Sequence, residues 1–469
     1  MTEGSALGVD FDQPQRVHVV AIGGAAMSGI ARYLRECGHE VSGSEVRSSS
    51  TTQALQHEGI DVAIGHDVNN IGAHCSVVVY STAVHRDNVE LVAARQRGIA
   101  VLHRADIMGW IANSQRSVAV ISGTHGKTST TSMLAEILRS TGQAPSYFIG
   151  GTPAGLATNA HYYNAGSWVV IEGDESDRSF LAFRRNLALV TNIEADHLEH
   201  WENSLDTLIQ GFDDFVAGAS DRALICMDDP IAAQLALRHG KSMRYGFHRD
   251  ADYRLSSYTA TAGGSRVTFA APDGETVGVD LVTRGTDMAT NALGAAALAN
   301  LIGVEWAVAV EGLALFRGVA RRFQYRATLN GADCYDDYAH TATEIATTIA
   351  RANEGGWRRV IAVCQPHRYT RIARHGTEYA DAFVGADHIV IAPLDPAFEV
   401  PIPGVSAQIV ADAVRAAHPT VPLDVCTTWE ALRDVPWRIG QPGDVIVTLG
   451  CGTITDIHSE WAEADRQRS

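Results

Sequence analysis

Excess positive charge and long apolar runs are both missing from this sequence. The 469 residues have a formal net charge of −17, whereas proteins that bind nucleic acid need a basic face to displace counterions. No apolar run approaches the roughly 20 residues that span a bilayer, and the polar, acidic N-terminus is unlike a signal peptide. We therefore expect a cytoplasmic protein, monomer or homodimer, whose partners are small molecules rather than nucleic acid or membrane.

Paired cysteines are also missing. The seven cysteines are odd in number and form no CxxC pair, so we interpret them as reduced, buried thiols and predict no zinc site. With 46% hydrophobic residues, the chain can bury several cores. Its length favours about three domains.

Lysine is the scarcest charged residue. Only Lys127 and Lys241 occur among 37 basic residues, and the others are arginine. Lys127 lies between a glycine and a threonine, where a compact ammonium fits a phosphate pocket better than arginine's planar fork. A buried strand is predicted over 118–121 and a helix over 130–139, which is the order of a phosphate-binding loop. Ile121 replaces the first glycine of the strict motif.

The loop predicts a nucleotide site with a magnesium ion. Backbone N–H groups and the helix N-terminus would hold the phosphates, Lys127 would reach the β and γ oxygens, and the Thr128 hydroxyl would bind Mg²⁺. The alternative is an ordinary glycine-rich turn that begins a helix, which leaves the retained lysine unexplained. The predicted nucleotide-binding residues are Gly123, Thr124, His125, Gly126, Lys127, Thr128 and Ser129.

Alternating helices and strands predict α/β architecture throughout. Residues 1–113 begin with a strand, a glycine-containing loop and a helix, followed by the acid Glu45 about 20 residues beyond the glycines, as in Rossmann-like domains. Residues 114–317 predict a central, mostly parallel sheet of the P-loop ATPase type. Short alternating strands over 252–283 predict a small antiparallel sheet at its side. Residues 318–469 predict a second Rossmann-like domain.

Two residues after buried strands extend the predicted site. Glu172 follows the apolar strand 168–171, and His197 lies just beyond a strand over 187–193. The carboxyl ends of parallel strands are where open α/β sheets bind ligands, so both side chains could hold a metal ion beside the phosphate loop. Taken singly, each has a simpler interpretation, as part of a solvated acidic loop or as a structural histidine.

Several sequence blocks follow one another over nearly the whole chain. They are Ile22-Gly23-Gly24, Met27-Ser28-Gly29-Ile30-Ala31, Gly123–Thr128, Glu172 with Asp174-Glu175-Ser176-Asp177, Thr191-Asn192-Ile193-Glu194-Ala195-Asp196-His197, Arg321-Arg322-Phe323, Asp336-Asp337-Tyr338-Ala339-His340 and Gln365-Pro366-His367-Arg368-Tyr369-Thr370-Arg371. Together, and in this order, they resemble the Mur ligase family, and within it the alanine-adding branch. Other branches need a modified lysine soon after the metal histidine, and none occurs between His197 and Lys241.

The resemblance implies an ATP-dependent amide ligase in peptidoglycan synthesis. It would join L-alanine to the carboxylate of UDP-N-acetylmuramate through an acyl phosphate, with ATP and Mg²⁺. Lys127, Glu172 and His197 would be catalytic, and Thr128, Glu172 and His197 would bind metal. By motif match, Asn291, Arg322 and Asp337 would bind ATP; His340, Arg368 and Arg371 would bind the amino acid; and Gly23, Gly24, Met27, Ser28, Gly29, Glu45, His66 and Arg104 would bind the UDP-sugar.

Departures from the family pattern lie in the substrate pockets. Ala26 replaces a loop glycine, Asp287-Met288 replace a His-Asn pair, Thr341-Ala342 replace a His-Pro pair, and Cys451 lies in an altered C-terminal glycine motif. They keep open a diverged paralogue that joins a different acid and amine, and a UDP-sugar-binding regulator without turnover. A nicotinamide dehydrogenase, suggested by the first glycine loop, would not explain the second nucleotide loop.

Overall fold

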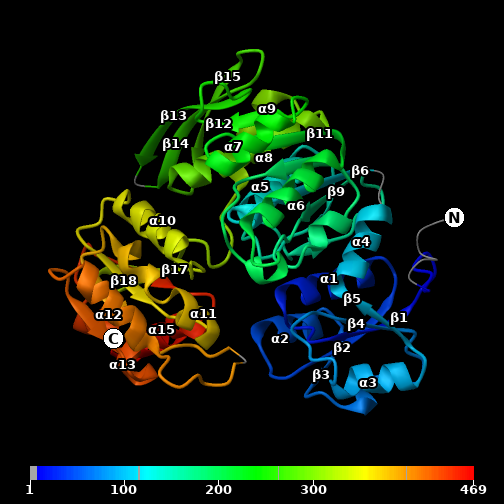
Figure 1. The fold of residues 1–469 in the computed structure, drawn as a ribbon, viewed down its shortest axis with the longest axis horizontal. Helices are drawn as coiled ribbons and strands as arrows, with labels where there is room; N and C mark the ends of the chain where they lie inside the picture. The colour runs from blue at the N-terminus through cyan, green and yellow to red at the C-terminus, as the bar shows by residue number, and fades with distance from the viewer. Residues whose placement is uncertain (1–7, 115–116, 262, 398, 469) are drawn as a thin grey trace. The chain divides into compact units, whose positions relative to one another are not determined.

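The computed structural model describes residues 8–114, 117–261, 263–397 and 399–468 and forms two compact units (Figure 1). The first comprises Met1–Tyr258, Val267–Leu281 and Asp287–Arg317, and the second comprises Thr259–Arg266, Val282–Thr286 and Gly318–Ser469. Both units are α/β, which confirms the predicted fold class. No helix among the described residues is long and apolar enough to span a membrane.

The N-terminal sheet of the first unit has five parallel strands in the order β3-β2-β1-β4-β5. Apolar residues of α1 and α4 pack on one face of this sheet, and those of α3 pack on the other (Figure 1). The strand order reverses between β1 and β4, which creates a ligand crevice at their carboxyl ends. The elements are β1 Arg16–Val20, α1 Ala25–Glu36, β2 Glu40–Glu45, α2 Ser50–His57, β3 Asp61–Ile64, β4 Val77–Tyr80, α3 Val89–Gln96, β5 Ala100–His103 and α4 Arg104–Ser114.

The central sheet has ten strands in the order β15-β14-β13-β12-β11-β10-β6-β9-β7-β8. The strands predicted over 252–283 form, and they continue this sheet beyond β12 instead of making a separate one. The strands are β6 Ser117–Ser122, β7 Ser146–Phe148, β8 Ala160–His161, β9 Trp168–Glu172, β10 Arg185–Val190, β11 Ala219–Cys226, β12 Met243–Gly246, β13 Tyr253–Thr261, β14 Gly264–Ala270 and β15 Thr276–Leu281. The helices are α5 Lys127–Ser140, α6 Leu205–Ala217, α7 Pro230–Arg238, α8 Thr286–Ile302 and α9 Trp306–Gly312.

The second unit contains a sheet in the order β16-β17-β21-β18-β19-β20, in which only β16 is antiparallel to its neighbour. Helices α10 and α12 pack on one face, and α13 and α15 pack on the other. The strands are β16 Gln324–Leu329, β17 Ala332–Asp337, β18 Val360–Cys364, β19 His388–Ile391, β20 Leu423–Val425 and β21 Val445–Leu449. The helices are α10 Ala342–Asn353, α11 Tyr369–His375, α12 Ala407–Ala417, α13 Trp429–Arg433, α14 Val435–Arg438 and α15 Ile457–Arg468.

Short 3₁₀ helices lie between the α-helices and strands. The 3₁₀ helices are η2 Val68–Asn70, η3 Ser179–Ala182, η4 Leu198–His200, η5 Leu313–Leu315, η6 Glu378–Phe383 and η7 Thr453–Asp456.

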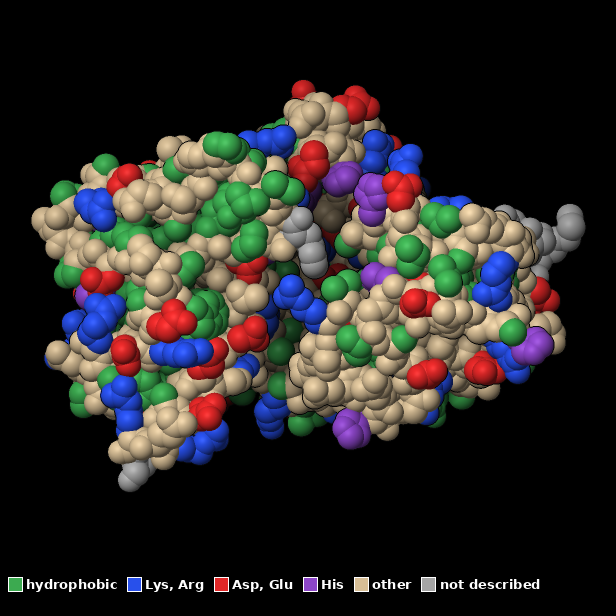
Figure 2. Space-filling view, turned by 90° about the horizontal axis from the view of Figure 1, so that it is seen from below, with side chains coloured by type: hydrophobic (Ala, Val, Ile, Leu, Met, Phe, Trp, Pro, Cys, Tyr) green, Lys and Arg blue, Asp and Glu red, His purple; other side chains and the backbone are tan. Residues whose placement is uncertain are grey.

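All seven cysteines are free, but Cys37, Cys75 and Cys451 are only partly buried, so the prediction of uniform burial is wrong for these three. Figure 2 shows acidic and basic side chains mixed across the face drawn.

Candidate functional site

The glycine-rich loop 123–126 follows the central strand of a group of three. β6 ends at Ser122, and its two neighbours in the sheet, β9 and β10, end at Glu172 and Val190. Ser122 pairs with Val190 in the register of β6 and β10, so these two strands end at the same edge of the sheet. Chain order reverses at β6, and the loop therefore lies in the crevice where open α/β sheets bind ligands.

Two loop positions accept only glycine. Gly123 has φ 135° and Gly126 has φ 85°, values that favour glycine. A Cβ on Gly123 would lie 2.0 Å from Thr191 Oγ1, and a Cβ on Gly126 would lie 2.6 Å from Asn291 Oδ1. Asn291 of α8 thus lies against the glycine-rich loop 123–126, and its contact with nucleotide stays a prediction. Gly126 is also the N-cap of α5, so the helix begins at Lys127, earlier than predicted.

Thr191 and Asn192, which follow β10, fix the loop conformation. Thr124 N donates to Asn192 O at 3.0 Å, and His125 N donates to Asn192 Oδ1 at 2.8 Å. In return, Asn192 Nδ2 and Thr191 Oγ1 donate to His125 O at 3.0 and 2.6 Å. Neither residue was among the predicted site residues. The sequence pattern that could have identified them is a pair of polar residues directly after a buried strand.

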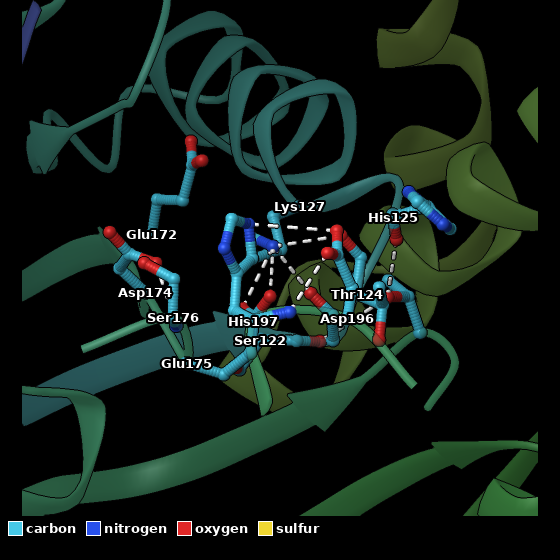
Figure 3. A network of polar contacts seen from close by, with 12 residues as sticks. Ser122, Thr124, His125, Lys127, Glu172, Asp174, Glu175, Ser176, Asp196 and His197 are labelled. Carbon is cyan, nitrogen blue, oxygen red and sulfur yellow. Dashed lines mark hydrogen bonds and ion pairs between the residues drawn. The ribbon is translucent and has the colours of Figure 1, made fainter. Parts of the chain in front are cut away.

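Lys127 is held by its own loop and by Glu175. Its Nζ donates to the carbonyl oxygens of Gly123 and Thr124 at 2.6 and 2.9 Å, and to Glu175 Oε1 at 3.0 Å. Burial alone lowers the pKa of Lys127, but the carboxylates of Glu175 and Asp174 more than offset this and raise it. The lysine is therefore a partly buried cation. In Figure 3 Glu172, Asp174 and Glu175 lie on one side of Lys127, and Thr124 and Asp196 lie on the other.

Thr128 and Glu172 offer oxygen ligands suited to magnesium. The Thr128 hydroxyl donates to Glu172 Oε1 at 2.9 Å, and Gly150 N donates to Oε2 at 2.7 Å. Mg²⁺ is usually bound by one or two protein groups together with substrate phosphates. No group of three or more His, Cys, Asp and Glu among the described residues could hold a metal ion. A cation bound by Thr128 and Glu172 would therefore need further ligands, from phosphate, water or the predicted ligand His197.

His197 is placed beyond β10 in a strained backbone conformation. Its φ is 51°, which is uncommon for a residue other than glycine and recurs at functional sites. Its Nε2 lies 3.5 Å from Asp196 Oδ2, and its Nδ1 lies 3.8 Å from Glu199 Oε1. The role of His197 as a metal ligand stays a prediction, because its polar neighbours here are these two carboxylates.

The N-terminal glycine loop leads into the first turn of α1. Gly23 N donates to Glu45 Oε2 at 2.9 Å, so the predicted acid lies beside the glycines. Gly24 is exposed and is the N-cap of α1, whereas residues 27–29 are buried within that helix. Backbone groups at the helix start, rather than the side chains at 27 and 28, are therefore available to a ligand.

His66 is oriented by a buried carboxylate. Its Nδ1 lies 2.9 Å from Glu90 Oε2, and Glu90 also accepts from Ser44 Oγ and Asn70 Nδ2 at 2.6 Å each. Burial raises the pKa of Glu90, but hydrogen bonds from His18, Ser44 and Asn70 bring it down to about 2. The Nε2 atom is thus the ring nitrogen that can face a ligand.

Arg104, whose contact with the UDP-sugar stays a prediction, contacts the acidic loop after β9 in this structure. Its Nη2 donates to Asp174 Oδ2 at 2.9 Å and to Asp177 Oδ2 at 2.6 Å. Burial raises the pKa of Asp174, but Lys127 and Arg104 lower it to about 2. The described contacts of Arg104 therefore join the start of α4 to the loop that holds Lys127.

In the second unit, the neighbouring strands β17, β21 and β18 also end at the same edge of their sheet. Asp337 of β17 and Cys364 of β18 both lie opposite Leu449 of β21. Asp337 accepts from Phe323 N at 2.7 Å and Ala339 N at 2.9 Å, so its carboxylate fixes the backbone on both sides. Arg322 lies 5.2 Å from the Tyr338 ring centroid. Their predicted contacts with nucleotide stay predictions.

The residues predicted to bind the amino acid come from the loops at this sheet edge. His340 Nδ1 lies 3.2 Å from Glu344 Oε2, and its carbonyl accepts from Tyr379. Arg368 Nε donates to Glu399 Oε1 at 2.9 Å. Arg371 Nη1, by contrast, is buried without a hydrogen-bond partner among the described residues. A substrate carboxylate would satisfy that atom.

Comparison with known proteins assigns the chain to a family. Residues 16–116 match the profile described as "Mur ligase family, catalytic domain", residues 121–299 match "Mur ligase middle domain", and residues 321–452 match "Mur ligase, glutamate ligase domain". The chain belongs to the Mur ligase family. This confirms the resemblance carried by the sequence blocks.

Named Mur ligases resemble the chain over nearly its whole length. The UDP-N-acetylmuramate–L-alanine ligase of Thermobifida fusca is 38% identical, covering 97% of this chain and 98% of that protein. The enzyme of the same name from Saccharopolyspora erythraea is 40% identical over 97% and 94%. The crystal structure of the Thermotoga maritima UDP-N-acetylmuramate-alanine ligase is 26% identical, with a TM-score of 0.83 over 97% of this chain and 100% of that one.

One departure from the Mur ligase pattern has a structural role here. Thr341 is the N-cap of α10 and forms a capping box with Glu344, whose carboxylate also accepts from His340 N at 3.0 Å. The substituted threonine therefore stabilises the helix start and, through Glu344, the position of His340. At the same sheet edge, burial raises the pKa of Cys451, an effect that Arg371 opposes.

Proposed function

We propose that this Mur ligase uses ATP to join L-alanine to the carboxylate of UDP-N-acetylmuramate, in the cytoplasm, for peptidoglycan synthesis. The observation that carries the proposal is the phosphate loop with Lys127, flanked by the Thr128–Glu172 pair. The full-length similarity to proteins named for this reaction supports the choice of substrates. ATP as the nucleotide agrees with the family, whose members are ATP-dependent enzymes.

The chemistry proceeds in two displacements. A carboxylate oxygen of the acid attacks the γ-phosphorus of ATP, an O–P bond forms and ADP leaves, while Lys127 stabilises the charge on the phosphoryl oxygens. The amine of the amino acid then attacks the acyl carbon, the C–N bond forms, the amine loses its proton and phosphate leaves. The residues that would hold Mg²⁺ are Thr128 and Glu172 with His197, and the ion would neutralise phosphate charge.

Each segment of the chain is assigned one substrate. Residues 1–113 would bind the UDP-sugar through the glycine loop, Glu45 and His66, while residues 114–317 would bind ATP. Residues 318–469 would bind the amino acid. Arg104 would also face the UDP-sugar, and it is paired with two carboxylates of the acidic loop after β9.

A diverged paralogue with another acid or amine is the second candidate. The departure from the family pattern at Thr341-Ala342, next to the predicted amino-acid-binding residue His340, favours it. A matrix of acids and amines distinguishes the two, with phosphate release and amide product measured for each pair. We expect activity with UDP-N-acetylmuramate and small amino acids such as alanine, glycine or serine, and sharp loss with ethylamine, which lacks the carboxylate. A difference of one methylene between two amino acids changes the preference of a pocket by only roughly 10- to 200-fold, so activity with several small amino acids should be measurable. No turnover of UDP-N-acetylmuramate with any amino acid would favour the paralogue.

The two arginines at the amino-acid site should contribute unequally. Arg371→Met should raise the KM for the amino acid by about 10- to 100-fold, because a charged hydrogen bond to the carboxylate is lost. Arg368→Met should have a smaller effect, since Arg368 is already paired with Glu399. Steady-state kinetics in amino acid and in ATP measure this, with the KM for ATP as the internal control. An unchanged amino-acid KM in Arg371→Met would exclude the carboxylate contact.

A further inference from the structure

Every donor of the Lys127 ammonium is in use. Its three N–H groups are directed at Gly123 O, Thr124 O and Glu175 Oε1, and Glu175 Oε2 lies 2.8 Å away as well. The lysine side chain is 15% exposed and that of Glu175 is 4% exposed. An ammonium has only three donors, so Lys127 must give up at least one of these partners before it can bind a phosphate oxygen.

Glu175 is the partner that a phosphate would replace. The two carbonyl groups are neutral and belong to the loop that would hold the phosphates, whereas Glu175 is an anion that competes with phosphate for the same positive charge. Burial raises the pKa of Glu175 to about 7, against the opposing effect of Lys127. The ionised carboxylate therefore depends on the lysine, and leaving it unpaired in this position would be unfavourable.

The loop that presents Glu175 is fixed on both sides. Arg104 binds the carboxylates of Asp174 and Asp177, and Trp201 Nε1 donates to the backbone oxygen of Glu175 at 3.1 Å. These contacts hold the Glu175 side chain over Lys127. They also make the position of Glu175 dependent on α4, which begins at Arg104.

We propose that Glu175 is a positioning residue for Lys127. Its carboxylate forms an ion pair with the lysine while the phosphate site is empty, and the phosphates of the nucleotide displace it. Arg104 holds the loop of Glu175 in place for this exchange. The proposal rests on the proposed use of the loop for ATP and adds a competitor for the same cation. Glu175 thereby weakens nucleotide binding, but it also neutralises the charge of a partly buried lysine.

The test is the affinity for AMP-PNP, measured by calorimetry without acid or amine, with and without Mg²⁺. Glu175→Gln keeps the size of the side chain and removes the competing charge, so we expect about tenfold tighter binding and a lower KM for ATP. A merely structural residue would give weaker binding on substitution. Glu175→Ala provides a second variant with the same expected direction, and thermal melting checks the fold of both.

Glu194→Gln is the matched control. Glu194 is also an acid beside the phosphate loop, 3.4 Å from His125 Nε2, but it is not among the partners of Lys127. If general charge repulsion governed the affinity, both variants would bind more tightly. We expect tightening in E175Q and little change in E194Q, and equal tightening in the two would overturn the proposal.

Arg104→Gln tests the second half of the proposal. Its effect on AMP-PNP affinity should differ by at least about threefold between the wild type and E175Q, because Arg104 acts through the loop that holds Glu175. Independent effects would remove Arg104 from the exchange. Unchanged or weaker binding in E175Q would overturn the role of Glu175 alone, whereas no nucleotide binding by any variant, including the wild type, would overturn both this proposal and the proposed function.

Discussion

Lys127→Arg should lower the rate of ligation by about 10³-fold while leaving the fold intact. The lysine Nζ occupies a small space between Gly123 O, Thr124 O and Glu175, and a planar guanidinium cannot place a point charge there. ADP release coupled to amide formation measures the rate, and thermal melting measures the stability.

Lys241 supplies a control from the same chain. It is the only other lysine and is exposed, so Lys241→Arg should leave the rate unchanged. Near-wild-type turnover by Lys127→Arg would refute the assignment of this loop to phosphate.

Glu172→Gln and His197→Ala should each raise the Mg²⁺ concentration for half-maximal rate by about 10- to 100-fold and should reduce formation of the acyl phosphate. The reason is the loss of one ligand position beside the phosphate loop, where Glu172 already contacts the Thr128 hydroxyl at 2.9 Å. Rates measured against free Mg²⁺ at saturating ATP test this.

Glu199→Gln is the corresponding control, because Glu199 lies near His197 but is half exposed. Its Mg²⁺ curve should match the wild type. If the curves of Glu172→Gln and His197→Ala also superimpose on the wild type, these two residues are structural rather than metal ligands.

The strands around the loop could be predicted from local pattern, because buried apolar runs end at glycine or acid. β6 and β9 lie within about two residues of their predicted ranges. The start of α5 was wrong, since the sequence does not reveal that Gly126 adopts a left-handed conformation and begins the helix at Lys127. Nor could it reveal that the strands over 252–283 join the central sheet, because strand order depends on long-range pairing.

The site was predictable where both partners lie at strand ends on one edge of a sheet, and less so where a contact depends on how a long loop folds back. Thr128 and Glu172 meet as expected, because loop and strand end share one sheet edge. Glu175 looked like part of a solvated acidic loop, and its burial becomes evident only with Lys127 beside it. The pairing of Arg368 with Glu399 likewise joins residues whose spacing in the sequence has no periodic signal.

Oxygen transfer from the acid to phosphate tests the central claim most directly. UDP-N-acetylmuramate labelled with ¹⁸O in its carboxylate would be incubated with the protein, ATP, Mg²⁺ and L-alanine, and the phosphate and amide products would be analysed by mass spectrometry. Ligation through an acyl phosphate predicts one ¹⁸O atom in each phosphate released, in step with formation of the alanyl amide. Unlabelled phosphate, or phosphate release without amide, would contradict the account.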